Sequence, residues 1–163
     1  MSAVGLVAAY VALGSNLGDR AAHLAAARAA LGALPETRIV AASRVEETAP
    51  IGPAGQGAYL NQMLHVETAL DAAVLLAAGH AAERAAGRTR DSATRWGPRT
   101  LDVDLVLFGE RSIDAPSLRV PHPELAHRDF WQRELAELGV DWRAVLGAVR
   151  DAEPAAAHVG VGA

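Results

Sequence analysis

The sequence contains no cysteine among its 163 residues. That absence excludes disulfide bonds, thiolate catalysis and cysteine-ligated zinc, and it fits a reducing compartment, so we expect a cytoplasmic location. Lysine is absent too, because all 15 basic residues are arginine. Schiff-base catalysis and a phosphate-binding lysine are therefore excluded. Any phosphate contact has to come from arginine, histidine, backbone N–H groups or a metal ion.

The net charge is small, and the apolar runs are short. The formal net charge of −4 argues against a nucleic-acid partner, because such proteins normally present a basic surface. The apolar run from Ala3 to Leu13 is shorter than the roughly 20 residues that cross a bilayer, and it lacks the cationic start of a signal peptide, so we expect no membrane partner. With 51% apolar residues the chain can bury a full core. We expect one domain over residues 1–163, with its core in residues 5–150 and a flexible tail at 151–163.

Hydrophobic periodicity predicts strands and helices in the order β-α-β-β-α-β, followed by an extra C-terminal helix. This is the order of a ferredoxin-like fold, an α+β sandwich in which helices pack on an antiparallel sheet. Asp19 and Asp71 are the expected N-caps of the first two helices, and Gly87 is expected just after the second. The predicted strands cover residues 7–13, 38–46, 59–68 and 101–108, the predicted helices cover 20–33, 72–86 and 122–138, and a hairpin is predicted within 109–120.

Two carboxylates, Asp102 and Asp104, lie at the start of the last predicted strand. Because side chains alternate along a strand, both project from one face, and Val103, Leu105 and Leu107 point into a core on the other. Two like charges held side by side repel each other unless a cation lies between them. Mg²⁺ is typically held by one or two carboxylates together with substrate phosphates. The pair therefore predicts a magnesium site, and the alternative is two solvated carboxylates on an edge strand.

Five arginines fall within 16 residues just before this strand. Like charges at this density repel one another unless an anion joins them, and a guanidinium group binds phosphate oxygens in pairs. Trp96 lies in the same loop, where a large exposed ring would be costly. The loop therefore indicates a phosphate-binding lid, and the alternative is a solvated charged surface. The five are Arg84, Arg88, Arg90, Arg95 and Arg99.

Tyr59 and Asn61 share one face of a predicted strand that follows a loop rich in glycine and proline. A ring beside a carboxamide suits a flat heterocycle, because the ring stacks and the amide reads donors and acceptors. An ordinary core tyrosine beside a satisfied asparagine is the alternative. Phe130 lies off the apolar stripe of the last predicted helix, which makes it a second candidate for ligand contact, while His122 is either structural or part of the same site.

Six short motifs occur along the chain in a particular order and spacing. The most specific is Arg95-Trp96-Gly97-Pro98-Arg99-Thr100-Leu101-Asp102-Val103-Asp104. The others are Ala12-Leu13-Gly14-Ser15-Asn16-Leu17-Gly18, Thr48-Ala49-Pro50-Ile51-Gly52-Pro53, Tyr59-Leu60-Asn61-Gln62, Gly87-Arg88-Thr89-Arg90 and Val120-Pro121-His122-Pro123. Together they resemble the 6-hydroxymethyl-7,8-dihydropterin pyrophosphokinase family over roughly residues 5 to 140. The resemblance implies an ATP-dependent transferase of folate biosynthesis, which moves pyrophosphate from ATP to the pterin 6-hydroxymethyl group and releases AMP.

The resemblance also implies roles for individual residues. Asp102 and Asp104 would bind two Mg²⁺ ions that bridge the ATP phosphates, and Arg88 and Arg99 would stabilise the transferring pyrophosphoryl group. The partners would be ATP and the hydroxymethyl-dihydropterin alone, and we expect a monomer. The implied pterin-binding residues are Thr48, Pro50, Ile51, Tyr59, Asn61 and Phe130. The implied nucleotide-binding residues are Glu83, Arg90, Trp96, His122 and Arg128.

Several positions depart from the family's pattern, which leaves substrate affinity and loop kinetics open. Ala49 replaces a common proline, Asp91 a common basic residue and Pro123 an aromatic residue of some members, and residues 131–134 replace a more apolar stretch. Two other functions also stay open at this stage. A nucleotidyltransferase would use strand carboxylates and two metal ions but release pyrophosphate. A ferredoxin-like binding module would show no metal dependence of its nucleotide affinity.

Overall fold

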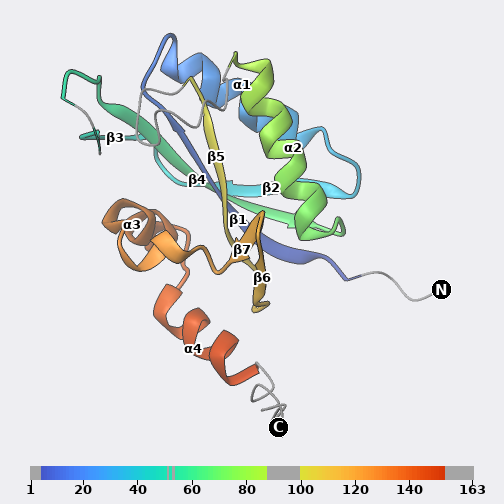
Figure 1. Cartoon of the computed structure of the whole chain (residues 1–163). Helices are drawn as coiled ribbons and strands as arrows, with labels where there is room; N and C mark the ends of the chain where they lie inside the picture. The colour runs from blue at the N-terminus through green and yellow to red at the C-terminus, as the bar shows by residue number, and fades with distance from the viewer. Residues whose placement is uncertain (1–4, 51, 53, 88–99, 153–163) are drawn as a thin grey trace, which may run out of the picture.

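The computed structural model describes residues 5–50, 52, 54–87 and 100–152 of the chain. Its centre is an antiparallel sheet with the strand order β2-β4-β1-β5, and a short strand, β3, also pairs with β4 (Figure 1). The element order and the antiparallel pairing confirm the predicted α+β, ferredoxin-like fold class. The elements are β1 (Val7–Ser15), α1 (Arg20–Gly32), β2 (Thr37–Ala42), β3 (Glu46–Thr48), β4 (Tyr59–Thr68), α2 (Ala72–Ala85) and β5 (Asp102–Phe108).

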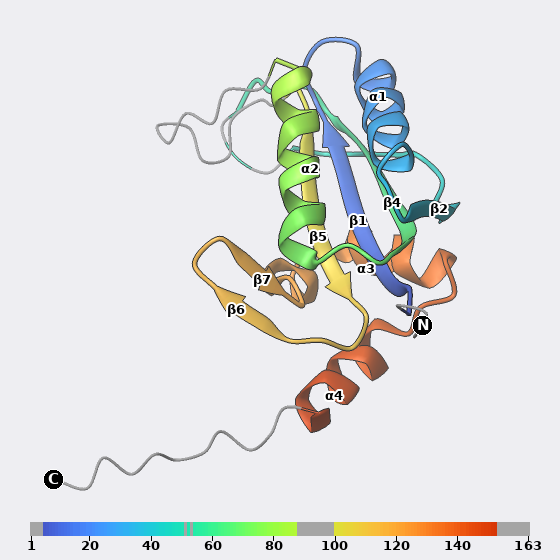
Figure 2. The same ribbon diagram turned by 90° about the vertical axis from the view of Figure 1, so that its right-hand side faces the viewer.

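Two hydrophobic cores lie on the two faces of this sheet. Helices α1 and α2 cover one face, and helix α3 (Asp129–Glu137) lies on the other (Figures 1 and 2). Along β4, Leu64 and Val66 belong to the core under α1 and α2, whereas Met63 belongs to the core under α3, where it packs with Trp131 and Leu135. The predicted alternation of this strand is therefore confirmed, and both of its faces are apolar because both are covered.

A β-bulge corrects one part of the predicted pattern in β5. Val11 of β1 pairs with Leu105 and Tyr10 pairs with Leu107, so Val106 has no partner in the register. One extra residue turns the following side chain to the other face of the sheet. Leu107 consequently packs under α3, and the prediction that it shares a core with Val103 and Leu105 was wrong.

A buried serine divides the predicted strand over residues 38–46 into two. Ser43 Oγ accepts a hydrogen bond from the Met63 N–H at 2.9 Å, and Gln62 Nε2 donates to the Ser43 carbonyl oxygen at 2.8 Å. These side-chain bonds interrupt the regular ladder, because they satisfy backbone groups that strand pairing would otherwise use. The prediction of one continuous strand was therefore wrong. The residues of β3 reach the sheet as a separate segment.

The C-terminal part is more divided than predicted. The hairpin is confirmed, with strands β6 (Ile113–Ala115) and β7 (Leu118–Val120). The single helix predicted over 122–138 is in fact a short 3₁₀ turn, η1 (Pro123–Ala126), followed by α3, because the backbone of Arg128 leaves the helical region. A further helix, α4 (Trp142–Ala152), was not predicted, and Val145 and Leu146 pack it against the core under α3.

Helix ends follow the expected chemistry with one exception. Asp19 caps α1 by accepting a hydrogen bond from the Ala22 N–H at 3.1 Å, and Gly87 follows α2 with a positive φ of 85°. Asp71 occupies the N-cap position of α2 but makes no capping side-chain hydrogen bond. Among the described helices, none has the length and hydropathy needed to cross a membrane.

Candidate active site

Asp102 and Asp104 begin the outermost strand of the sheet, β5, and both are partly exposed. Their neighbours Val103 and Leu105 are buried under α1 and α2, so the two carboxylates project from the other face, as the alternation predicted. Across the ladder on β1 stand two of the smallest residues, with Gly14 opposite Asp102 and Ala12 opposite Asp104. The space in front of the carboxylates is open because these neighbours have almost no side chain.

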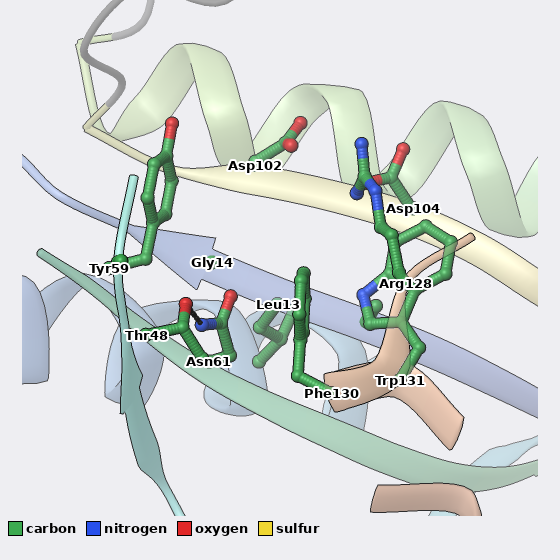
Figure 3. A pocket seen from close by; sticks show the side chains of 12 residues that line it. Leu13, Gly14, Thr48, Tyr59, Asn61, Asp102, Asp104, Arg128, Phe130 and Trp131 are labelled. Atoms are coloured by element: carbon green, nitrogen blue, oxygen red, sulfur yellow. Dashed lines mark hydrogen bonds and ion pairs between the residues drawn. The ribbon is translucent and has the colours of Figure 1, made fainter. Parts of the chain in front are cut away.

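A pocket lies beside the carboxylates, with about 540 Å³ of space that includes open solvent. Tyr59 from β4 and Phe130 from α3 stand on either side of Thr48 and Asn61, with Asp102 on the strand beyond (Figure 3). Two aromatic rings facing a common space suit a flat ring between them, because offset stacking is favourable on both sides. The structure thus brings together four of the residues implied for pterin binding, from three elements far apart in the sequence.

The polar end of this pocket is held in one orientation. Asn61 Nδ2 donates a hydrogen bond to Thr48 Oγ1 at 2.6 Å, and Asn61 is buried. A Cβ atom built on Gly14 would lie 3.2 Å from Asn61 Oδ1 and 3.4 Å from Tyr59 Cδ1. Glycine at position 14 therefore allows both side chains to approach β1 closely.

Three cationic or aromatic side chains surround Asp104. His122 Nε2 lies 3.6 Å from Asp104 Oδ1, and Arg128 Nη1 lies 3.9 Å from Asp104 Oδ2. His122 Nδ1 accepts a hydrogen bond from the Glu124 N–H at 3.1 Å, which leaves the proton of a neutral ring on Nε2, toward the carboxylate. The Arg128 guanidinium lies 4.3 Å from the ring centroid of Trp131, so the indole fixes its plane. Arg128 therefore presents positive charge beside Asp104, and His122 presents an N–H group there.

A second, larger depression lies on the other side of the same two carboxylates. It offers about 1020 Å³ of space, which includes open solvent, and it is lined by the β6–β7 hairpin, by α2 and by His122. Asp102 and Asp104 line both cavities. Two ligands that occupied the two spaces would therefore meet at the carboxylate pair.

Glu83 has a structural role that the sequence did not indicate. Only 1% of it is exposed, and its Oε1 accepts a hydrogen bond from the Val103 N–H at 2.9 Å. Val103 stands between the two aspartates, so this bond ties α2 to the strand that carries them. The observed burial favours positioning of β5 over the direct nucleotide contact that the resemblance implied.

The carboxylate pair fits a hard divalent cation. Mg²⁺ takes oxygen ligands and is usually held by one or two carboxylates plus substrate phosphates. No group of three or more His, Cys, Asp or Glu side chains that could hold a metal occurs within the described residues. The other ligands of a Mg²⁺ ion held by Asp102 and Asp104 would be substrate phosphate oxygens and water.

Not every implied residue can be placed. Pro50 is described but Ala49, its neighbour, is the one that lines the pocket beside Thr48. The remaining implied residues, Ile51, Arg88, Arg90, Trp96 and Arg99, lie outside the described residues.

Some lining residues were missed by the sequence reasoning. Leu13, Gly14 and Trp131 all line the pocket with the two aromatic walls. Trp131 belongs to the core under α3 and also lines the pocket. The small residues Ala12 and Gly14, two positions apart on one strand, were the signal that could have indicated an open face.

The comparisons with known proteins agree with this geometry. A family model described as 7,8-dihydro-6-hydroxymethylpterin-pyrophosphokinase matches residues 10–140. A curated relative from Pseudomonas aeruginosa is 46% identical over 134 residues, which is 82% of each chain. Relatives from Bacillus subtilis (40% over 130 residues, 80% of this chain and 77% of the relative) and Haemophilus influenzae (37% over 136 residues, 83% and 84%) are also similar. All three are named 2-amino-4-hydroxy-6-hydroxymethyldihydropteridine pyrophosphokinase.

Proposed function

The chain belongs to the 7,8-dihydro-6-hydroxymethylpterin-pyrophosphokinase family, and from that premise we propose which of its residues bind each substrate. It is an ATP-dependent diphosphotransferase of folate biosynthesis, which transfers pyrophosphate from ATP to the hydroxymethyl group of the dihydropterin and releases AMP. We assign the pterin to the pocket between Tyr59 and Phe130, and ATP to the depression beside the β6–β7 hairpin. We propose further that the whole chain forms one catalytic domain.

One observation carries this assignment: the two cavities have Asp102 and Asp104 in common. The acceptor hydroxyl of the pterin has to meet the β-phosphorus of ATP in line with the leaving AMP. Such a reaction depends mainly on positioning and on electrostatic stabilisation of the charge that develops around phosphorus. A wall shared by both substrates is where the two reacting atoms would meet.

Asp102 and Asp104 would hold the Mg²⁺ that the reaction uses, and we propose two ions. Bound there, Mg²⁺ supplies charge neutralisation to the phosphate oxygens. The aspartates themselves fix the position of the triphosphate relative to the pterin. Val103 between them is held by Glu83. This bond supports β5, which among the described strands of the sheet pairs only with β1.

Recognition of the pterin is proposed to combine stacking with polar contacts. Tyr59 and Phe130 would stack on the two faces of the ring. Because Thr48 Oγ1 accepts a hydrogen bond from Asn61, its own hydroxyl hydrogen can be donated to the ligand, and Asn61 Oδ1 can accept one. Pro50 and Ile51 are proposed to complete this edge of the pocket.

On the nucleotide side, Arg128 and His122 are proposed to contact phosphate oxygens, because both already lie within 4 Å of Asp104. Arg88 and Arg99 are proposed to stabilise the transferring group, as arginine side chains do in other phosphoryl transfers, where they raise the rate by about 10³- to 10⁵-fold. Arg90 and Trp96 are proposed to act in nucleotide binding. Glu83 is proposed to act on the nucleotide only through β5.

The cellular setting is also a proposal. ATP and the pterin are the only partners we propose, with no nucleic acid, since the net charge is −4. We propose a monomer, because a single chain lines both cavities, and a cytoplasmic location, where ATP is available.

Two variants test the assignment of the cavities. We expect Phe130→Ala to raise the KM for the pterin with little change for ATP. We expect His122→Ala to raise the KM for ATP with little change for the pterin, because His122 lines the depression beside the hairpin and not the pocket between Tyr59 and Phe130. Both KM values are measured from the AMP formed. Arg143→Ala is the control, because its guanidinium lies 4.4 Å from the Trp142 ring centroid and away from both cavities. The opposite pattern of KM changes would show that the substrates are assigned the wrong way round.

A further inference from the structure

Helix α3 buries an acid next to the proposed pterin pocket. Glu134 is 2% exposed and follows Phe130 by one helical turn. Its neighbours Trp131 and Leu135 pack into the core under α3. Within the described residues, neither carboxyl oxygen of Glu134 accepts a hydrogen bond from any donor. A buried carboxylate without donors is strongly unfavourable, so its presence here needs an explanation.

The groups around Glu134 make its negative charge still less favourable. Burial, together with the nearby carboxylates of Glu46 and Glu137, raises the pKa of Glu134 to about 9, and the Arg133 charge opposes this shift. Arg133 is exposed and shared, because its guanidinium bridges Glu46 at 3.3 Å and Asp129 at 3.2 Å.

Among the described residues, the other cation near this part of α3 is Arg44, and it is engaged with Glu137. Glu137 accepts a hydrogen bond from the Arg44 N–H at 2.8 Å and lies 3.7 Å from the Arg44 guanidinium, so that cation is already engaged. On the facing strand β4, Asn61 and Met63 carry no charge, and His65 on the same face stacks on Tyr10, with 4.9 Å between the ring centroids. The environment of Glu134 therefore favours the neutral acid.

Protonation of Glu134 allows its carboxyl group to donate a hydrogen bond. Among the groups that raise the pKa of Glu134, the Glu46 carboxyl on β3 is the one that does so through a side-chain hydrogen bond, and as an anion it can only accept. A hydrogen bond between two carboxyl groups exists only when one of them carries a proton. Glu46 has the Arg133 guanidinium at 3.3 Å and a side chain that is 22% exposed, whereas Glu134 is 2% exposed and has no hydrogen-bond donor among the described residues. The proton therefore belongs to Glu134, which becomes the donor.

We propose that Glu134 is a positioning residue for the pterin pocket: as a neutral acid it donates a hydrogen bond to Glu46 and holds α3 against β3. The consequence follows from what the two elements carry. Phe130 is on α3, and Thr48 is on β3, two residues after Glu46. When Glu134 loses its proton, two anions face each other between these elements, and the distance between Phe130 and Thr48 changes. This inference rests on the proposed pterin site.

The test compares the pH dependence of the wild type with that of Glu134→Gln, which keeps a donor but cannot ionise. In the wild type we expect kcat/KM for the pterin to fall about tenfold per pH unit above a pH of about 9, while the KM for ATP changes little. In Glu134→Gln the neutral-pH value should be retained within about twofold and the alkaline fall should be absent. Glu137→Gln removes one of the carboxylates that raise the pKa of Glu134, so this variant should keep the alkaline fall but show it at a lower pH than the wild type. An alkaline fall of equal size in Glu134→Gln would overturn the proposal.

A second measurement separates this inference from the proposed function and does not require a folded variant. Carbon-13 NMR of the glutamate carboxyl groups in the wild-type chain titrates Glu134 directly. A carboxyl resonance of Glu134 that titrates well above pH 7 supports the proposal, and one that titrates near the ordinary value of about 4.3 overturns it. If the chain formed no AMP at all, the proposed function would fail, but the titration would still decide the state of Glu134.

Discussion

Substitution of Gly14 tests the pocket geometry, because glycine at this position leaves room for Asn61 and Tyr59 to approach β1. In Gly14→Ala the new Cβ would lie 3.2 Å from Asn61 Oδ1 and 3.4 Å from Tyr59 Cδ1. The first distance is shorter than an ordinary contact, so Asn61 has to move by a few tenths of an ångström. Asn61 is buried and hydrogen-bonded to Thr48, which means that the shift is transmitted to the polar edge of the pocket.

The magnitude can be bounded from packing. An extra methyl group in a well-packed site costs about 1–3 kcal/mol. If the cost falls on the pterin complex, the Kd for the pterin rises by about 5- to 160-fold. The Kd for ATP should change little, because Gly14 does not line the depression beside the hairpin. Calorimetric titration with each substrate separates the two effects.

The control is Gly147→Ala in α4, where a Cβ meets nothing within 4 Å. It should leave both dissociation constants unchanged and raise the melting temperature slightly, because alanine is the better helix former. A folded Gly14→Ala protein with an unchanged pterin Kd would refute the reasoning that Asn61, Tyr59 and β1 are packed to contact at this point.

Three further results are expected. Gly79→Ala should destabilise the fold by about 1–3 kcal/mol in denaturant titrations, because its Cβ would lie 2.7 Å from Val103 Cγ1 between α2 and β5; an unchanged midpoint would contradict this packing. Glu83→Ala should lose about 1–3 kcal/mol by leaving the Val103 N–H without its acceptor, and Glu83→Gln, which keeps an acceptor, should lose less. Folding raises the pKa of Glu134 to about 9, so its contribution to stability is complete below its unfolded pKa and is lost as the pH rises through 9. In the wild type the free energy of unfolding should therefore fall between the unfolded pKa and pH 9, and in Glu134→Gln it should stay flatter over the same pH range.

Local pattern was enough to predict much of the fold and part of the site. The alternation along residues 59–68 and the helix signals at Asp19 and Gly87 are properties of neighbouring residues, and they predicted the ferredoxin-like order correctly. The same period of two predicted that Asp102 and Asp104 share a face, because strand geometry fixes it whatever the rest of the chain does. The motif resemblance, which depends only on residue identity and order, predicted the family.

Register and long-range contact decided the rest. A single bulge opposite Tyr10 and Val11 sent Leu107 to the other core, and nothing in its own neighbourhood indicates a bulge. β2 ends before Ser43 because Ser43 forms hydrogen bonds with Met63 and Gln62 of β4.

The sequence by itself determined the family, the order of the elements and the facing carboxylates, since each of these follows from residues close together along the chain. Tertiary structure alone decided that Phe130 faces Tyr59 across a pocket, that Glu83 supports β5 and that Glu134 is buried against Glu46. The physical reason is that burial and partnership of a side chain depend on segments distant in sequence, so a glutamate on a helix is an ordinary surface residue until the fold covers it.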